Sequence, residues 1–288
     1  MSRVAYVNGQ YVPLQEAGVH VEDRGYQFAD GVYEVIAFAA GRMLEAEGHL
    51  ERLDRSLAEL AIAAPMGRRA LRAVLAECIR RNRLSAGIVY VQITRGVARR
   101  DHAFPAHAVP TLVVTVRRAK GPPKAAIAEG VGVITLPDIR WKRCDIKSVA
   151  LLPNVLAKQA ARQRGAFEAW MVGDDGAVTE GSSTNAWIVT KEGEVVTHPA
   201  GPAILNGITR MAVIAAARRA GFSVVERSFT VAEALAAREA FLTSTTSHVL
   251  PVVSIDGKPV GNGHPGSTTI ALRQAYLADL AISGGAGA

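Results

Sequence analysis

The chain has 288 residues, which corresponds to about two domains of roughly 150 residues each and suffices to bury a core without disulfides or metal ions. Hydrophobic residues make up 49% and charged residues 20% of the sequence, which excludes a disordered or fibrous protein. No apolar run reaches the roughly 18 residues that cross a bilayer, and the first residues lack the apolar core of a signal peptide. We therefore expect a cytoplasmic protein that does not associate with membranes.

The cysteines and the net charge limit the chemistry further. Cys78 and Cys144 are too few for a disulfide framework or a zinc site, and we expect no metal ion. The formal net charge is +7, from 33 basic and 26 acidic residues. Because the basic residues occur as isolated pairs such as Arg68-Arg69, the charge favours a surface that attracts anionic ligands. A basic nucleic-acid-binding module is the alternative from a different class of protein.

The N-terminal part of the chain is predicted to contain strands, then helices, then strands again. Leucines at positions 50, 53, 57 and 60 share one face of a helix, and apolar residues between Leu71 and Ile79 repeat in the same way. Runs of β-branched residues predict strands at Gly87–Thr94 and Thr111–Val116. The proline pair in Lys120-Gly121-Pro122-Pro123-Lys124 is typical of an extended connector. We therefore expect an N-terminal domain at 1–119, a linker at 120–125 and a C-terminal domain at 126–288.

Beyond this linker, short strand patterns alternate with helical ones. Strands are predicted at Gly132–Leu136, Phe167–Val172, Asn185–Thr190 and Phe222–Glu226. A helix is predicted at Leu151–Arg164 with its end at Gly165, and Thr230-Val231-Ala232-Glu233 is a capping box that begins another. The interleaving predicts an α/β (α+β) fold with layers of both kinds in each domain.

Two polar segments of the C-terminal part have residue types suited to chemistry. Asp145-Ile146-Lys147-Ser148 runs into an apolar stretch, where loss of solvation would free the lysine amine as a nucleophile. The alternative is a lysine whose ammonium group extends from a helix start to solvent. Thr179-Glu180-Gly181-Ser182-Ser183-Thr184-Asn185 precedes a strand, and its alternative is a simple Gly-Ser loop.

Two further segments are suited to binding an anion. Leu205-Asn206-Gly207-Ile208-Thr209-Arg210 runs into a helical pattern, whose first N–H groups and the Thr209 hydroxyl suit a phosphate. Thr243-Ser244-Thr245-Thr246-Ser247 provides a row of hydroxyls at a strand end. A plain turn and a threonine-rich edge strand are the respective alternatives.

In this order, these strings resemble the class IV (fold type IV) pyridoxal-phosphate aminotransferases, most closely the branch specific for D-amino acids. The resemblance extends from about residue 6 to residue 276. It rests on the following segments: Glu22-Asp23-Arg24-Gly25-Tyr26-Gln27-Phe28, Asp30-Gly31-Val32-Tyr33-Glu34-Val35, Thr94-Arg95-Gly96, Arg143-Cys144-Asp145-Ile146-Lys147-Ser148, Glu180-Gly181-Ser182-Ser183, Gly207-Ile208-Thr209-Arg210 and Thr243-Ser244-Thr245-Thr246-Ser247. It implies a homodimer of two-domain subunits, with a small N-terminal domain and a larger C-terminal domain that has a barrel-like sheet and carries the lysine.

The resemblance also implies roles for individual residues. Lys147 matches the lysine that holds pyridoxal 5′-phosphate as an internal aldimine, and Glu180 matches the carboxylate at the pyridine nitrogen. The remaining cofactor-binding positions are Arg52, Leu205, Ile208, Thr209, Ser244 and Thr245. The substrate-binding positions are Tyr33, Arg100, His102 and Thr246, of which Arg100 and His102 match a loop that binds the α-carboxylate in the D-specific branch.

The implied reaction is ping-pong transamination of D-amino acids with 2-oxo acids, of the D-alanine/2-oxoglutarate type. Three alternatives share the fold: a branched-chain L-amino-acid aminotransferase, an (R)-amine transaminase and an aminodeoxychorismate lyase. The resemblance of Arg100 and His102 to the carboxylate-binding loop of the D-specific branch argues against the first two. We expect amino acids and 2-oxo acids as its only partners besides a second subunit, with no nucleic acid.

Overall fold

The computed structural model describes residues 3–119 and 121–285, without the side chains of 282–285. Its contacts divide the chain into two units. The first contains the described residues up to 119, the segment Ile146–Ala150 and residues 283–285. The second contains Gly121–Asp145 and Leu151–Ile282. Each unit has its own sheet and its own hydrophobic core.

The first unit is built on a six-stranded antiparallel sheet with the order β2-β1-β6-β5-β3-β4. Its strands are β1 (Val4–Val7), β2 (Gln10–Pro13), β3 (Gly31–Ala39), β4 (Arg42–Met43), β5 (Ala86–Thr94) and β6 (Thr111–Arg117). Buried and partly exposed residues alternate along β3 and β6, because one face of the sheet packs on the core. The strands predicted at 87–94 and 111–116 are confirmed.

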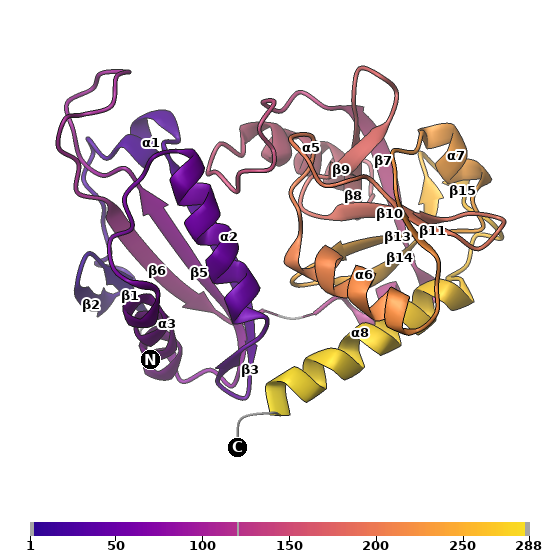
Figure 1. Cartoon of the computed structure of the whole chain (residues 1–288), viewed down its shortest axis with the longest axis horizontal. Helices are drawn as coiled ribbons and strands as arrows, with labels where there is room; N and C mark the ends of the chain where they lie inside the picture. Colours follow the sequence, from indigo (N-terminus) through magenta and orange to yellow (C-terminus); the bar gives the residue numbers. More distant parts are fainter. Residues whose placement is uncertain (1–2, 120, 286–288) are drawn as a thin grey trace. The chain divides into compact units, whose positions relative to one another are not determined.

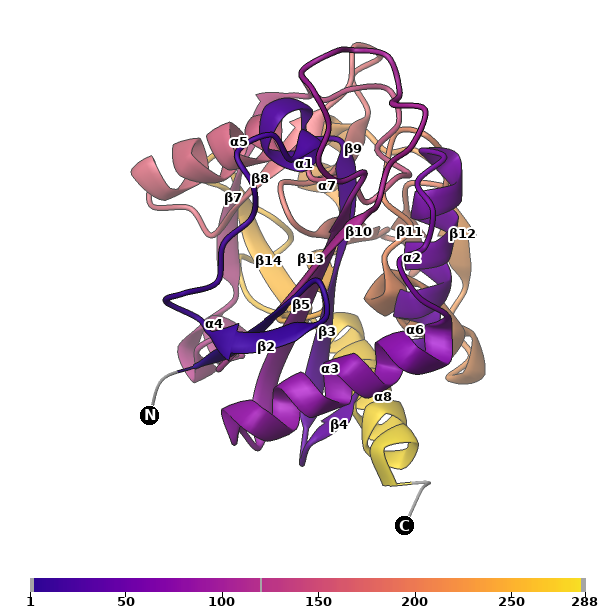
Figure 2. The same cartoon turned by 90° about the vertical axis from the view of Figure 1, so that its left-hand side faces the viewer.

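Two long helices cover one face of this sheet, and a short one lies at its end (Figure 1). They are α1 (Arg24–Phe28), α2 (Ala46–Glu59) and α3 (Arg68–Asn82). Leu50, Leu53 and Leu57 of α2 are buried, as are Leu71, Leu75, Cys78 and Ile79 of α3. The helix periodicity read from the sequence is therefore confirmed for both, although Leu60 follows the end of α2 as its C-cap residue and is only partly buried. In Figure 2, α1 lies beside the long loop that connects β5 to β6.

The segment that carries Lys147 belongs to the first unit, which differs from the predicted domain boundaries. The Tyr33 amide donates to the Lys147 carbonyl and the Val149 amide to the Gly31 carbonyl, both at 3.0 Å. Ile146 is buried in the core of the first unit. These contacts attach the segment to β3, whereas the boundaries drawn from the proline pair assign it to the C-terminal domain. Lys120 of the predicted linker lies outside the described residues, and α4 already begins at Lys124.

The second unit contains a nine-stranded mixed sheet with the order β12-β11-β10-β13-β14-β7-β8-β9, and β15 pairs with β14. Its strands are β7 (Val131–Pro137), β8 (Glu168–Val172), β9 (Val178–Gly181), β10 (Asn185–Val189), β11 (Val195–Thr197), β12 (Val224–Glu226), β13 (Glu239–Ser244), β14 (His248–Ile255) and β15 (Lys258–Pro259). The sheet curls, since β9 at one end packs beside β10, and the Gly181 amide donates to the Thr184 carbonyl at 2.7 Å. This half-barrel confirms the predicted barrel-like sheet.

The helices of the second unit are α4 (Lys124–Glu129), α5 (Leu152–Gln163), α6 (Ile208–Arg219), α7 (Val231–Ala236) and α8 (Ser267–Gly285). The predicted helix after Lys147 corresponds to α5, and Gly165 follows it with φ +70°, a conformation that favours glycine. The predicted capping box at the start of α7 is confirmed: the Thr230 hydroxyl accepts from the Glu233 amide, and the Glu233 carboxylate accepts from the Thr230 amide. No helix among the described residues has the length and apolarity needed to cross a membrane.

Candidate active site

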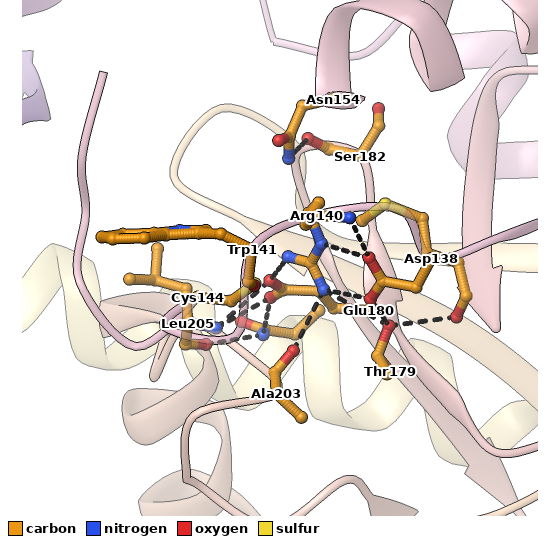
Figure 3. Close-up of polar contacts among 12 residues, drawn as sticks. Asp138, Arg140, Trp141, Cys144, Asn154, Thr179, Glu180, Ser182, Ala203 and Leu205 are labelled. Atoms are coloured by element: carbon orange, nitrogen blue, oxygen red, sulfur yellow. Dashed lines mark hydrogen bonds and ion pairs between the residues drawn. The ribbon is translucent and has the colours of Figure 1, made fainter. Parts of the chain in front are cut away.

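Glu180 is a buried carboxylate at the centre of a polar network in the second unit (Figure 3). It lies on β9, and only 6% of the residue is exposed. Its oxygens accept from the Leu205 amide at 3.1 and 3.2 Å and from Nδ2 of Asn185 at 3.0 Å. Arg140 also donates to it through Nη1. These donors favour the ionised carboxylate, so Glu180 is suited to face a cationic N–H group.

Arg140 and Asp138 were not predicted as site residues. Nε and Nη2 of Arg140 donate to the two Asp138 carboxylate oxygens at 2.9 and 2.7 Å. Burial alone would lower the pKa of Arg140, but the hydrogen bonds to Asp138 and the charge of Glu180 raise it above its usual value. Burial raises and Arg140 lowers the pKa of Asp138, and the net shift is downward. The sequence signal is slight: Asp138 and Arg140 are two charged residues within three positions of the end of β7.

The start of α6 provides hydrogen-bond donors that nothing in the described chain uses. Gly207 is the N-cap residue, and no side chain caps the helix. Ile208 and Thr209 are buried, and the Thr209 hydroxyl has no hydrogen-bond partner among the described residues. A Cβ at Gly207 would overlap the Asn185 amide oxygen. The tightly packed backbone at Gly207 and the uncapped N–H groups of the helix start together suit a phosphate group.

The hydroxyl-rich segment lies at the same edge of the sheet as the partners of Glu180. Asn185 on β10 pairs with Thr243 on β13, and Ser244 ends β13 directly after it. Ser244 and Thr245 are partly buried, whereas Thr246 is exposed. The Ser244 hydroxyl accepts from the Ser247 amide at 3.1 Å. The second unit therefore brings together Glu180, Leu205, Ile208, Thr209, Ser244, Thr245 and Thr246.

The residues of the second unit fit pyridoxal phosphate in two respects. A protonated pyridine nitrogen requires a buried anion, which Glu180 provides. A phosphate requires N–H and O–H donors, which α6 and the unpartnered Thr209 hydroxyl provide. Leu205 connects the two parts, since its amide binds Glu180 and α6 begins three residues later.

Lys147 and Tyr33 are neighbours in the first unit. Nζ of Lys147 lies 4.3 Å from the centre of the Tyr33 ring, and the Lys147 amide donates to the Ser56 hydroxyl at 3.3 Å. The lysine side chain is partly buried. Packing of the ammonium group on an aromatic face restricts its position, which suits a nucleophile that reacts at one point.

Arg52 is held by an anion that was not predicted as a site residue. Its Nε and Nη2 donate to the two oxygens of Glu34 at 2.7 and 2.8 Å, and Nδ1 of His49 lies 2.8 Å from Glu34. Burial opposes ionisation of Glu34, but Arg52 and His49 hold its pKa at about 2. The alternation along β3 signals this residue, because Glu34 occupies the buried face between Val32 and Ile36.

Arg100 and His102, in the loop between β5 and β6, both lie near one aromatic ring, that of Phe28. The Arg100 guanidinium lies 5.0 Å from the centre of the Phe28 ring, and the His102 ring lies 5.4 Å from it. Both side chains are exposed. The Asp101 carboxylate accepts from the Ala103 amide at 3.2 Å, so it is directed to the backbone of its own loop. An exposed guanidinium and an exposed imidazole near the same ring can bind a carboxylate.

Arg24 holds the backbone of this loop. It is 3% exposed, and its Nη1 donates to the carbonyls of Asp101 and Ala103 at 2.6 and 3.3 Å. Nη2 donates to the His102 carbonyl at 3.4 Å, and Nε to Asp30 at 2.8 Å. The loop conformation around His102 therefore depends on a buried residue of α1.

The cysteines and the acidic residues give no sign of metal or thiol chemistry in the described chain. No group of three His, Cys, Asp or Glu residues there could hold a metal ion. Burial raises the pKa of Cys78 to about 12 and that of Cys144 to about 11. Both thiols are therefore protonated and poorly nucleophilic at neutral pH.

Comparison with known proteins identifies the family. The family model described as amino-transferase class IV matches residues 31–255, which include β3, Lys147, Glu180 and the start of α6. The chain belongs to the class IV aminotransferases. It is therefore an enzyme that uses pyridoxal phosphate to move an amino group between amino acids and 2-oxo acids.

Curated relatives of this class IV aminotransferase cover nearly the whole chain. It is 42% identical to a D-alanine aminotransferase from Bacillus licheniformis, over 95% of this chain and 97% of that one. It is 40% identical to a D-alanine aminotransferase from Listeria monocytogenes, over 95% of each chain. A D-alanine aminotransferase from Staphylococcus aureus is 38% identical over 94% of this chain and 95% of its own.

Solved structures share its fold. A branched-chain amino acid aminotransferase from Escherichia coli superposes with a TM-score of 0.90 at 23% identity, over 97% of this chain and 95% of that one. A branched-chain aminotransferase from Thermoproteus uzoniensis gives a TM-score of 0.87 at 26% identity, over 98% of this chain and 96% of its own. The predicted fold type IV architecture is thus confirmed.

Proposed function

We propose that this aminotransferase acts on D-amino acids and transfers their amino group to 2-oxo acids. The observation that carries the proposal is the arrangement of Arg100 and His102 around Phe28, with their loop backbone held by buried Arg24. A guanidinium and an imidazole in this arrangement bind a carboxylate by charge-assisted hydrogen bonds. The naming of the three relatives as D-alanine aminotransferases supports the same substrate class.

Lys147 and Glu180 carry the chemistry in this proposal. Bound pyridoxal phosphate supplies an electron-accepting ring that stabilises negative charge at the substrate α-carbon. Nζ of Lys147 would hold the cofactor and, once free, would take the proton from the substrate α-carbon. Glu180 would face the pyridine nitrogen and keep it protonated, which its buried and multiply hydrogen-bonded carboxylate supports.

The remaining candidates hold the cofactor and the substrate in place. The amides of Ile208 and Thr209, the hydroxyls of Thr209, Ser244 and Thr245, and the Arg52 guanidinium would bind the phosphate. Leu205 would pack behind the ring. Arg100, His102 and Tyr33 would bind the substrate carboxylate, with Thr246 at the edge of the substrate site.

The proposal includes a homodimer in the cytoplasm. Apolar side chains of the loop that carries Arg100 are exposed, Phe104 by 62% and Val109 by 83%, which supports their burial against a second subunit. In such a dimer the loop would reach the partner subunit's site. The two thiols, both buried and unpaired, are compatible with a reducing compartment.

A half-reaction tests the substrate class. Purified enzyme loaded with pyridoxal phosphate is mixed separately with D-alanine, L-leucine and (R)-1-phenylethylamine, and the absorbance of the bound cofactor is followed without an oxo acid. We expect rapid conversion by D-alanine only, with one pyruvate formed per site. Conversion by L-leucine alone would support a branched-chain enzyme. This is the second candidate, because branched-chain aminotransferases of known structure resemble this chain. Conversion by the amine alone would indicate an (R)-amine transaminase.

A further inference from the structure

We propose that Asp138 and Arg140 set the charge at Glu180: Arg140 fixes the carboxylate, and Asp138 cancels the charge of Arg140 so that Glu180 keeps one net negative charge for the ring nitrogen. The inference rests on the proposed role of Glu180. It assigns to two residues outside the predicted site a direct effect on the electron-accepting strength of the cofactor.

The geometry separates the two ends of the guanidinium. Asp138 binds the side of Arg140 through Nε and Nη2, which leaves Nη1 for Glu180. The three side chains are buried, with 11%, 6% and 8% exposed for Asp138, Arg140 and Glu180. Figure 3 shows the guanidinium between the two carboxylates. Arg140 therefore bridges them in a site where water screens little of the charge.

The backbone makes this bridge rigid. Nη2 of Arg140 also donates to the Ala203 carbonyl at 3.0 Å, and the Asp138 amide donates to the Val172 carbonyl at 2.8 Å. The Thr179 hydroxyl lies 2.7 Å from Asp138. Because the network joins the end of β7, strand β9 and the turn before α6, it fixes the orientation of the Glu180 carboxylate.

The charges decide what the bridge does. An arginine alone beside Glu180 would cancel the negative charge of the carboxylate. The carboxylate would then stabilise a second cation, the protonated ring nitrogen, less strongly. With Asp138 present, two anions and one cation leave a net charge of −1. The nearby Cys144 thiol, whose pKa is raised to about 11, is neutral at pH 7, and Asp145 is paired with Arg143.

Three variants of the enzyme loaded with ¹⁵N-labelled pyridoxal phosphate test the inference. The pH at which the ring nitrogen loses its proton is measured for each by ¹⁵N NMR in a pH series without substrate. Asp138→Asn leaves no net charge, so we expect the nitrogen to lose its proton at least about one pH unit below wild type. Arg140→Met leaves two anions and should not lower this value. The double variant restores a single anion and should return the titration close to wild type.

Kinetics and a control complete the experiment. With Asp138→Asn we expect the half-reaction with D-alanine to slow by about tenfold or more. Asp279→Asn, which breaks the surface pair with Arg219, should match wild type in both measurements. If Asp138→Asn does not fold, Arg140→Met carries the test, since a nitrogen that loses its proton at a lower pH than in wild type despite two remaining anions would overturn the inference.

The outcomes are distinct. A shift in the same direction for all three variants would indicate a structural role only and would overturn the inference, as would a wild-type titration for Asp138→Asn. Failure of wild-type enzyme to react with D-alanine would refute the proposed substrate instead. It would leave the nitrogen titrations, which need no substrate, interpretable.

Discussion

Buried hydroxyl groups of the second unit differ in whether they have a hydrogen-bond partner within the described chain. The hydroxyl of Thr197 donates to the Ala186 carbonyl at 2.9 Å, whereas the equally buried hydroxyl of Thr209 has no partner among the described residues. An unsatisfied buried hydroxyl destabilises a folded protein by about 1 to 3 kcal/mol. The unpartnered Thr209 hydroxyl therefore destabilises the cofactor-free protein, and a bound phosphate would remove this destabilisation.

This difference predicts opposite effects on stability and on cofactor binding. Replacing Thr209 by valine should raise the free energy of unfolding of the cofactor-free protein by about 1 kcal/mol, because the unpartnered hydroxyl is lost. The same variant should bind pyridoxal phosphate about tenfold more weakly. Urea unfolding and a spectroscopic cofactor titration measure the two effects.

Thr197→Val is the matched control, since it removes a satisfied hydroxyl of equal burial. It should lower the stability of the cofactor-free protein and leave cofactor affinity unchanged. A lower free energy of unfolding in Thr209→Val, with unchanged cofactor affinity, would show that this hydroxyl is structural.

At the scale of elements, one buried ion pair attaches α2 to β3. Glu34 of β3 binds Arg52 and His49 of α2, and its pKa is about 2 against an ordinary value of 4.5. The ionised form of Glu34 therefore stabilises the fold above about pH 4.5, and this contribution is lost as the pH falls toward 2. The shift corresponds to about 3 kcal/mol at neutral pH.

Glu34→Gln should lower the free energy of unfolding at pH 7 by about 3 kcal/mol, because it removes the buried carboxylate charge that Arg52 and His49 bind. Its stability should also fall less steeply than that of wild type between pH 5 and about pH 3. Urea unfolding in a pH series measures both effects. Glu51→Gln, on the exposed face of the same helix, is the control and should follow the wild-type curve. Parallel curves for wild type and Glu34→Gln would contradict the assignment.

A second element-scale contact joins α1 to the loop between β5 and β6. Arg24 binds three successive loop carbonyls, and a lysine at this position could not span them because an ammonium lacks the planar fork of a guanidinium. Arg24→Lys should therefore raise KM for D-alanine roughly tenfold while changing kcat little. Steady-state kinetics at saturating 2-oxoglutarate measure this separation.

The control for Arg24 is Arg80→Lys, an equally conservative change at an exposed position of α3. It should leave both constants unchanged. An equal fall of kcat and kcat/KM in Arg24→Lys, with KM unchanged, would argue that Arg24 does not act through the substrate loop.

Across the whole molecule, local pattern predicted the elements and missed the contacts between distant residues. The α2 leucines and the α7 capping box are signals that lie within one or two helical turns, and both are confirmed. The bridge from Arg140 to Glu180 joins residues 40 positions apart, the first in the loop after β7 and the second on β9. No periodicity encodes such a pairing. The roles of Lys147 and Glu180 came from family resemblance, because neither spacing nor composition distinguishes them from ordinary surface residues.

The proposed dimer leads to a prediction about which subunit provides each site residue. If the Arg100 loop serves the partner subunit's site, a mixed dimer of one Lys147→Ala subunit and one Arg100→Ala subunit has one site with both changes and one with neither. Such a dimer should regain about half of the wild-type activity, since a twofold dimer has two equivalent sites. Co-expression with two different affinity tags and purification on both yields the mixed dimer.

Each parent dimer is the control, and the tag-matched wild-type dimer sets full activity. Lys147→Ala should have no measurable turnover, because no other amine replaces its nucleophile and proton carrier. Arg100→Ala should retain turnover at a much higher KM for D-alanine, because the substrate carboxylate loses its guanidinium partner. At low D-alanine both parents are then inactive, so activity of the mixed dimer can come only from a site built by both subunits. If Arg100 acts within its own subunit, every site carries one change and the mixed dimer stays as inactive as its parents.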